Sequence, residues 1–214
     1  MAIQYNTEYL GKFLAPGISD FTVCDAVDLT DSYPQAAHWL TNHFLNALFR
    51  SGYKNKYRQY AINQMHRAQV AFADYHEARD LTLEFLARGN PDNPASKIYF
   101  RALARWESCL LNLQIFIDVM NKMKTDLQDD PVFKKRDGTP AERAYSIANT
   151  VKHWGEDIFA GRHEEADTVP LWLTNGGLKT RKTELAYSEL TALVSEVAAV
   201  ADKMQNPDAF AADV

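Results

Sequence analysis

Residues 99–120 carry apolar side chains at alternating steps of four and three residues. This spacing places the side chains on one face of an α-helix and, when sustained for about three heptads, is typical of the seam of a helical bundle. A seam of that length stays buried only when other helices pack along it. The sequence therefore predicts an antiparallel helical bundle around this helix, whose seam positions are Tyr99, Leu103, Trp106, Leu110, Leu113, Ile117 and Met120.

A second long helix is predicted over residues 55–88, where small side chains fill the seam. Small side chains allow two helix backbones to approach closely. A short loop rich in Pro and Gly, GNPDNP at 89–94, joins the two helices, so we expect them to form a long antiparallel hairpin. The small seam residues are Ala61, Ala68, Ala71 and Ala78.

Capping signals place the boundaries of the helices. TPAE at 139–142 combines a Thr N-cap, a Pro in the first turn and a Glu three residues after the cap. SYPQ at 32–35 and NPAS at 93–96 are similar start signals, and NGG at 175–177 is a stop signal. No alternation of period two is long enough to predict a strand. We expect an all-α fold in one domain, 1–214, with an irregular lead-in at 1–30, a frayed tail at 206–214, and about five helices over 33–50, 55–88, 94–127, 140–160 and 183–205.

Composition and charge narrow the classes of function. The formal net charge is −5, and no long basic run is present, which argues against extended binding to DNA or to an anionic membrane. No run of roughly 18 apolar residues predicts a membrane span, and the sequence MAIQYNTEYL is unlike a signal peptide, so we expect a cytoplasmic protein. Cys24 and Cys109 form no CxxC pair and no Gly-rich phosphate loop occurs, so we expect neither structural zinc nor a cofactor.

The predicted helix over 140–160 carries an unusual strip of polar side chains. On a helical wheel one side is apolar, with Ile147, Val151, Trp154 and Ile158. The opposite side is either a solvated face or a site presented to a substrate or a partner, because a His can exchange protons near pH 7 and a Lys or an Asn can hold an anion. This polar strip consists of Asn149, Lys152, His153 and Glu156.

The segment NTVKHW at 149–154 resembles the end of the motif of the HEPN family, the higher eukaryotes and prokaryotes nucleotide-binding proteins. Asn149 and His153 match the Asn and the His of that motif, whereas Ala148 stands where the family has an Arg. The nearest upstream Arg, Arg143, lies ten residues before His153. The resemblance implies a small helical bundle, often dimeric, and in many members a metal-independent ribonuclease. The Ala at position 148 favours a non-catalytic relative.

The segment VPLWLTNGG at 169–177 is a predicted loop that contains a large apolar patch around Trp172. One interpretation is a buried lid on the end of the bundle, since large aromatic side chains are usually buried. The other is a contact surface for a partner, since Trp is favoured at binding hot spots.

A carboxylate-bridged metal centre is a third interpretation that long helical bundles invite. Its hallmark, Glu-x-x-His on two helices, does not occur in the sequence. His76 and Asp80 lie one helical turn apart, with Glu77, Glu84 and Glu107 as further candidate ligands. Because the defining spacing is missing, we expect no metal site.

We expect a non-catalytic HEPN-like module of a bacterial cell that acts in interaction, in regulation or in binding of a small ligand. It would form a homo-oligomer, a dimer, with RNA or a nucleotide as candidate ligand. The alternative is a metal-independent endoribonuclease in which His153 is the general acid or base and a basic residue such as Lys152, Arg101, Arg105 or Arg143 steadies the phosphate. Candidate catalytic residues are His153, Lys152 and Asn149, and candidate binding residues are Glu156, Trp154, Trp172 and Arg143.

Overall fold

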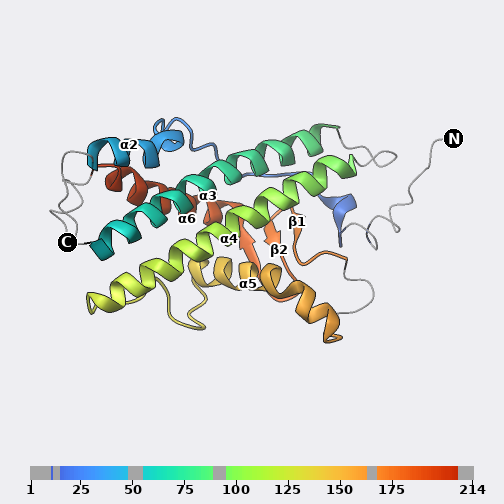
Figure 1. Ribbon diagram of the computed structural model, residues 1–214. Coiled ribbons are helices and arrows are strands. Elements are labelled where there is room, and N and C mark those ends of the chain that lie inside the picture. Colours follow the sequence, from blue (N-terminus) through green and yellow to red (C-terminus); the bar gives the residue numbers. More distant parts are fainter. Residues whose placement is uncertain (1–10, 12–14, 48–54, 89–94, 163–167, 207–214) are drawn as a thin grey trace.

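The computed structural model describes residues 11, 15–47, 55–88, 95–162 and 168–206. In these parts the chain forms five α-helices, as the sequence predicts (Figure 1). They are α2 (Trp39–Ala47), α3 (Asn55–Arg88), α4 (Ser96–Asp126), α5 (Pro140–Phe159) and α6 (Tyr187–Met204). Two short 3-10 helices, η1 (Ile18–Asp20) and η2 (Ala36–His38), precede α2. No helix in the described ranges is long and apolar enough to cross a membrane.

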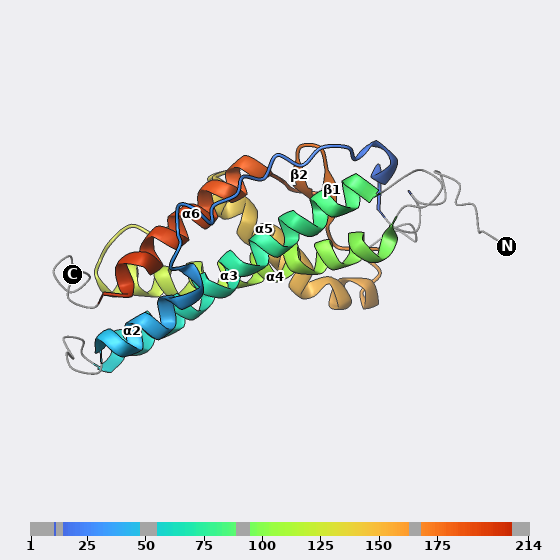
Figure 2. The ribbon, with the colours of Figure 1, turned by 90° about the horizontal axis from the view of Figure 1, so that it is seen from above.

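Helices α3 and α4 form the long hairpin on which the other elements pack (Figures 1 and 2). Six of the seven predicted seam residues of α4 are buried, and Met120 is half-buried. The four seam alanines of α3 are buried as well. The prediction of a close antiparallel hairpin with a large-to-small seam is confirmed.

The predicted start signals differ in outcome. Thr139 caps α5, and its hydroxyl oxygen accepts a hydrogen bond from the Glu142 backbone N–H at 3.3 Å, as expected. At 32–35 no helix is capped by a side chain: the 3-10 helix η2 follows Gln35, and the α-helix begins only at Trp39. The predicted cap at Asn93 lies outside the described residues, and α4 begins after Ala95, which has a positive φ of 44°.

The helical bundle is confirmed, and it carries in addition a small antiparallel sheet that the sequence did not predict. Strands β1 (Trp172–Thr174), β2 (Gly177–Lys179) and β3 (Glu184–Ala186) pair in chain order. The segment predicted as a loop at 169–177 thus forms β1 and a turn, and the segment predicted to begin the last helix at 183 is β3. Each strand has three residues, too few to show alternation of period two in the sequence.

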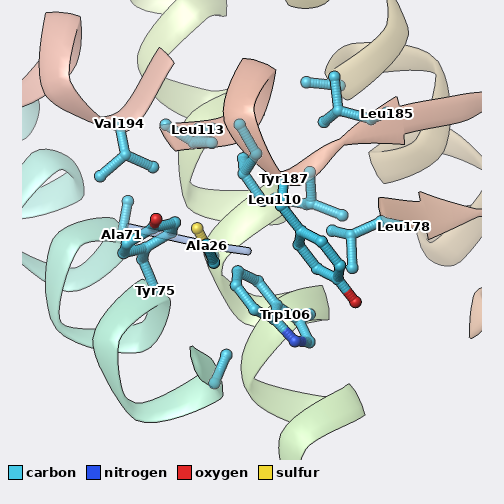
Figure 3. Packing of buried hydrophobic residues seen from close by; sticks show 14 of the residues in the cluster. Ala26, Ala71, Tyr75, Trp106, Leu110, Leu113, Leu178, Leu185, Tyr187 and Val194 are labelled. Carbon is cyan, nitrogen blue, oxygen red and sulfur yellow. The ribbon is translucent and has the colours of Figure 1, made fainter. Parts of the chain in front are cut away.

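The sheet closes one side of the core (Figure 3). Leu178 of β2 lies beside the ring of Tyr187 at the start of α6, and that ring packs on Trp106 of α4 with 5.8 Å between the ring centroids; Leu185 projects from β3. All four side chains are fully buried. Of the three strands, β3 takes the place of the first turn that was predicted for the last helix.

The described part of the predicted lead-in, residues 15–30, has only one short 3-10 helix, as expected of an irregular segment. It is nevertheless part of the core, because Phe21, Ala26 and Leu29 are buried. Figure 2 shows this segment running along α6. The Tyr75 hydroxyl of α3 donates to the Val27 carbonyl at 2.8 Å and holds the segment in place.

Candidate functional site

Helix α5 lies antiparallel to α4, and two side-chain hydrogen bonds set its position. The Tyr145 hydroxyl donates to Asp118 Oδ1 at 2.9 Å, and Gln114 Nε2 donates to Asn149 Oδ1 at 2.6 Å. Gln114 is a buried side chain of α4. Asn149 therefore faces the neighbouring helix, and the wheel that placed it on the outward strip is wrong at this residue.

The far end of α5 leaves the core. Ile147 is fully buried and Val151 and Trp154 are half-buried, but Ile158 is 51% exposed and Phe159 is 95% exposed. Figure 1 shows the last turns of α5 diverging from α4. The predicted apolar stripe is therefore buried at its first residue, as expected, and exposed at its last, because α5 extends beyond the part of the core on which it packs.

The other members of the polar strip lie on this projecting end. Lys152 is exposed, and the His153 side chain is 45% exposed. His153 Nδ1 lies 3.1 Å from Glu156 Oε2 one turn later, and that carboxylate is 77% exposed. The strip thus combines an imidazole–carboxylate pair with a nearby amine on a solvated surface.

Arg143 belongs to a different surface of α5. Its guanidinium donates to Glu189 of α6 and to the Gly138 carbonyl. The hydrogen bond from Arg143 lowers the pKa of the Glu189 carboxyl group. Arg143 precedes His153 by ten residues, about 15 Å along a helix, so these two predicted site residues are not brought together.

The predicted aromatic site residues are not equivalent. Trp172 is only 8% exposed and belongs to the main core, which confirms the interpretation as a buried aromatic and excludes Trp172 as an exposed contact residue. Trp154 is half-buried on the projecting part of α5. Between these two, only Trp154 lies on the same turns of α5 as the polar strip, on the opposite side of the helix.

A buried carboxylate between α3 and α4 was not singled out by the sequence. Asp74 is 5% exposed and accepts hydrogen bonds from Arg105 Nη1 at 3.0 Å and from Ser108 Oγ at 2.6 Å. Arg105 also pairs with Glu77 at 3.0 Å. Arg105, considered above as a phosphate-binding residue, is instead part of the ion-pair network that joins the hairpin.

Four of the five side chains considered as metal ligands have other partners. His76 Nε2 accepts from the Leu29 backbone N–H at 3.0 Å, and Asp80 pairs with Arg79 at 2.8 Å. Within the described residues no three His, Cys, Asp or Glu side chains gather as a metal site. Burial raises the pKa of the Glu107 carboxyl group, which favours its neutral form.

The clearest candidate surface is thus the projecting end of α5, which we call the α5 tip: Lys152, His153, Glu156, Ile158 and Phe159. It presents the opposite charges of Lys152 and Glu156 near two exposed apolar side chains, those of Ile158 and Phe159. No family model, curated protein or solved structure matches the chain.

Proposed function

We propose that this protein is a non-catalytic, HEPN-like interaction module that associates with a second copy of itself through the α5 tip. The observation that carries the proposal is the exposure of Phe159, which reaches 95% at the end of a helix whose first half is anchored in the core by Ile147. Large apolar side chains gathered on a surface mark interaction sites, and aromatic residues are enriched at the centre of interfaces. A partner that covers Phe159 and Ile158 would remove both from water.

The charges of the α5 tip suit a two-fold interface. In such an interface a residue of one copy contacts a second residue of the other copy, and the reverse contact occurs too. Lys152 and Glu156 lie one turn apart with opposite charges. If two copies of α5 pack antiparallel, each Lys152 lies opposite the glutamate of the α5 tip in the other copy. The interface then contains two attractive pairs of charges.

The surroundings of His153 support a role without catalysis. Cleavage of a phosphodiester needs positive charge to steady the phosphate in the transition state. The charged group that pairs with the His153 ring is a carboxylate, that of Glu156 at 3.1 Å, whereas the amine of Lys152 is exposed to solvent, and Arg143 and Arg105 are held by Glu189 and Asp74 elsewhere. A phosphate at His153 would meet repulsion from Glu156.

Sedimentation equilibrium over a range of protein concentrations tests the self-association. The parent should form dimers, and Phe159→Ser should weaken the dimer by about tenfold or more, as expected for an interface hot spot worth 1–2 kcal/mol. Phe44→Ser is the matched control, because Phe44 is a 45% exposed aromatic on α2, outside the α5 tip. A parent that stays monomeric, or equal weakening by both substitutions, would refute the proposed interface.

The absence of catalysis needs its own test, because a dimer is compatible with a ribonuclease. Purified protein is incubated with labelled single-stranded RNA beside the His153→Ala variant. We expect no cleavage by either protein. Cleavage by the parent that is lost in the variant would overturn the non-catalytic assignment and favour the endoribonuclease.

A further inference from the structure

An apolar pocket of about 150 Å³ lies between α4 and α6, on a different part of the molecule from the α5 tip. Eight of its nine lining residues are apolar, and the ninth, Glu196, is exposed. Its inner walls include the buried Leu113, Phe116 and Val197. The lining residues are Leu113, Phe116, Ile117, Met120, Val132, Leu193, Glu196, Val197 and Val200.

The rim of the pocket is built by the connection between α4 and α5. This connection folds back on α4, where the Val132 backbone N–H donates to Asn121 Oδ1 at 2.8 Å. The next residue, Phe133, packs its ring on Tyr145 of α5, with 5.2 Å between the ring centroids. The connection is thus tied to both helices, and Val132 lies at the mouth with 37% of its surface exposed.

The walls and the mouth differ in chemistry, and together they define a class of ligand. A pocket lined by aliphatic and aromatic side chains disfavours polar groups, because such groups would lose their hydrogen bonds to water. An apolar cavity of this size in another protein holds a benzene ring. Glu196 is the charged side chain among the nine lining residues, and its carboxylate attracts a cation by charge complementarity.

We propose that this pocket binds a small amine whose apolar part, about the size of a benzene ring, enters between α4 and α6 while its ammonium group pairs with Glu196. The apolar part would contact the side chains of Leu113 and Val197, and the ammonium group would stay at the hydrated mouth. This assignment does not depend on the α5 tip or on self-association. Methionine at position 120 can adjust its side chain to the shape of the ligand, since Met is unbranched and flexible.

Benzylamine is the probe, and benzyl alcohol and benzoate are matched probes that carry no charge and a negative charge. Binding to the full chain is followed at pH 7 by two-dimensional amide NMR, which detects weak ligands and locates them. We expect benzylamine to shift amides of α4 and α6 and to bind more tightly than the alcohol, with benzoate the weakest. Equal affinities for benzylamine and benzoate would refute the role of Glu196.

Two variants separate the apolar part of the site from its charge. Val200→Phe should fill the pocket and abolish binding, and Leu193→Phe is the second filling variant if the first one does not fold. Glu196→Gln should weaken benzylamine by about fivefold, as for an exposed ion pair worth up to about 1 kcal/mol, and should leave benzyl alcohol unchanged. Asp20→Asn, an exposed carboxylate of η1, is the control and should change neither affinity.

Three results would overturn the proposal. The first is the absence of amide shifts at millimolar benzylamine. The second is benzylamine binding that persists in a folded filling variant. The third is self-association of the parent that Val200→Phe abolishes and Phe159→Ser does not, because the pocket would then be an interface between copies of the chain.

Discussion

Gly177→Ala should be among the most damaging single substitutions in this chain, although it adds one methyl group. Gly177 begins β2 at a φ of 150°, a region that favours glycine. A Cβ at this position would lie 2.1 Å from the Leu185 carbonyl oxygen and 2.8 Å from Ala186 Cα. Both are backbone atoms of the paired strand and its connection to α6, so no side chain can rotate to make room.

The expected loss of stability follows from the change that the added methyl group forces on the pairing of β2 with β3. Relief of the contact requires β2 and β3 to separate by about 1 Å, which weakens ladder hydrogen bonds worth about 1 kcal/mol each. Forcing alanine into this region of φ adds about 1–3 kcal/mol. We expect a loss of about 3 kcal/mol in the free energy of unfolding, and a fall in Tm of roughly 6–12 °C for a chain of this size.

Urea titration followed by circular dichroism measures this loss, with Gly155→Ala as the matched control. Gly155 lies inside α5, and apart from its chain neighbours and the backbone of its own helix no atom of the described residues lies within 4 Å of its Cβ position, so alanine should stabilise the helix by about 1 kcal/mol. A Gly177→Ala variant within about 0.5 kcal/mol of the parent would show that β2 and β3 are not paired as described.

Four further predictions concern single side chains: three substitutions and one dependence on pH. Asn175→Ala should cost about 1–3 kcal/mol, because the Asn175 side chain makes three hydrogen bonds to the backbone of residues 20–23; urea titration measures the loss, and a neutral substitution would argue against this anchor. Tyr75→Phe should cost about 1–2 kcal/mol, since it removes hydrogen bonds to the Val27 carbonyl and the Thr191 hydroxyl. Tyr187→Phe should cost less than about 1 kcal/mol, because the buried Tyr187 hydroxyl has no nitrogen or oxygen partner among the described residues and only the Cys24 thiol, a weak hydrogen-bonding group, beside it; equal losses in the two variants would contradict this pair of predictions. Burial raises the pKa of Tyr75 from 10.0 to about 12, so the unfolded chain ionises first and stability should fall as the pH rises from 10 to 12. This shift corresponds to about 3 kcal/mol, and thermal unfolding midpoints that stay level over this range in the parent, or fall equally in Tyr75→Phe, would count against it.

The parts of the fold that were predicted correctly depend on neighbours in the sequence. The seam around Trp106 repeats within one helix, and the Thr139 cap bonds a residue three positions later. Such signals need no knowledge of the rest of the chain. The sheet shows the opposite case: Asn175 bonds the backbone of Thr22, 153 residues away, and the NGG that signals a helix end lies in a turn between two strands. An Asn-Gly pair between short apolar runs also indicates a hairpin, and that signal could have identified β1 and β2.

For the candidate site, a helical wheel predicted the solvated Lys152 and Glu156 correctly but not the partner of Asn149. A wheel assumes one buried side along the whole helix, whereas α5 packs on α4 at Asn149 and leaves it before Phe159. The pocket at Glu196 is likewise formed by two helices and their connection, so no single stretch of sequence contains its pattern.

Sequence by itself determined which segments become long helices and which face of the α3–α4 hairpin is buried, because helix formation and amphipathic burial repeat every few residues along one chain. Tertiary structure decided the sheet, the buried position of Trp172, the pairing of Arg143 with Glu189 and the exposure of Phe159. Each of these depends on where one element ends relative to another that is distant in sequence, and that relation exists only once the chain has packed.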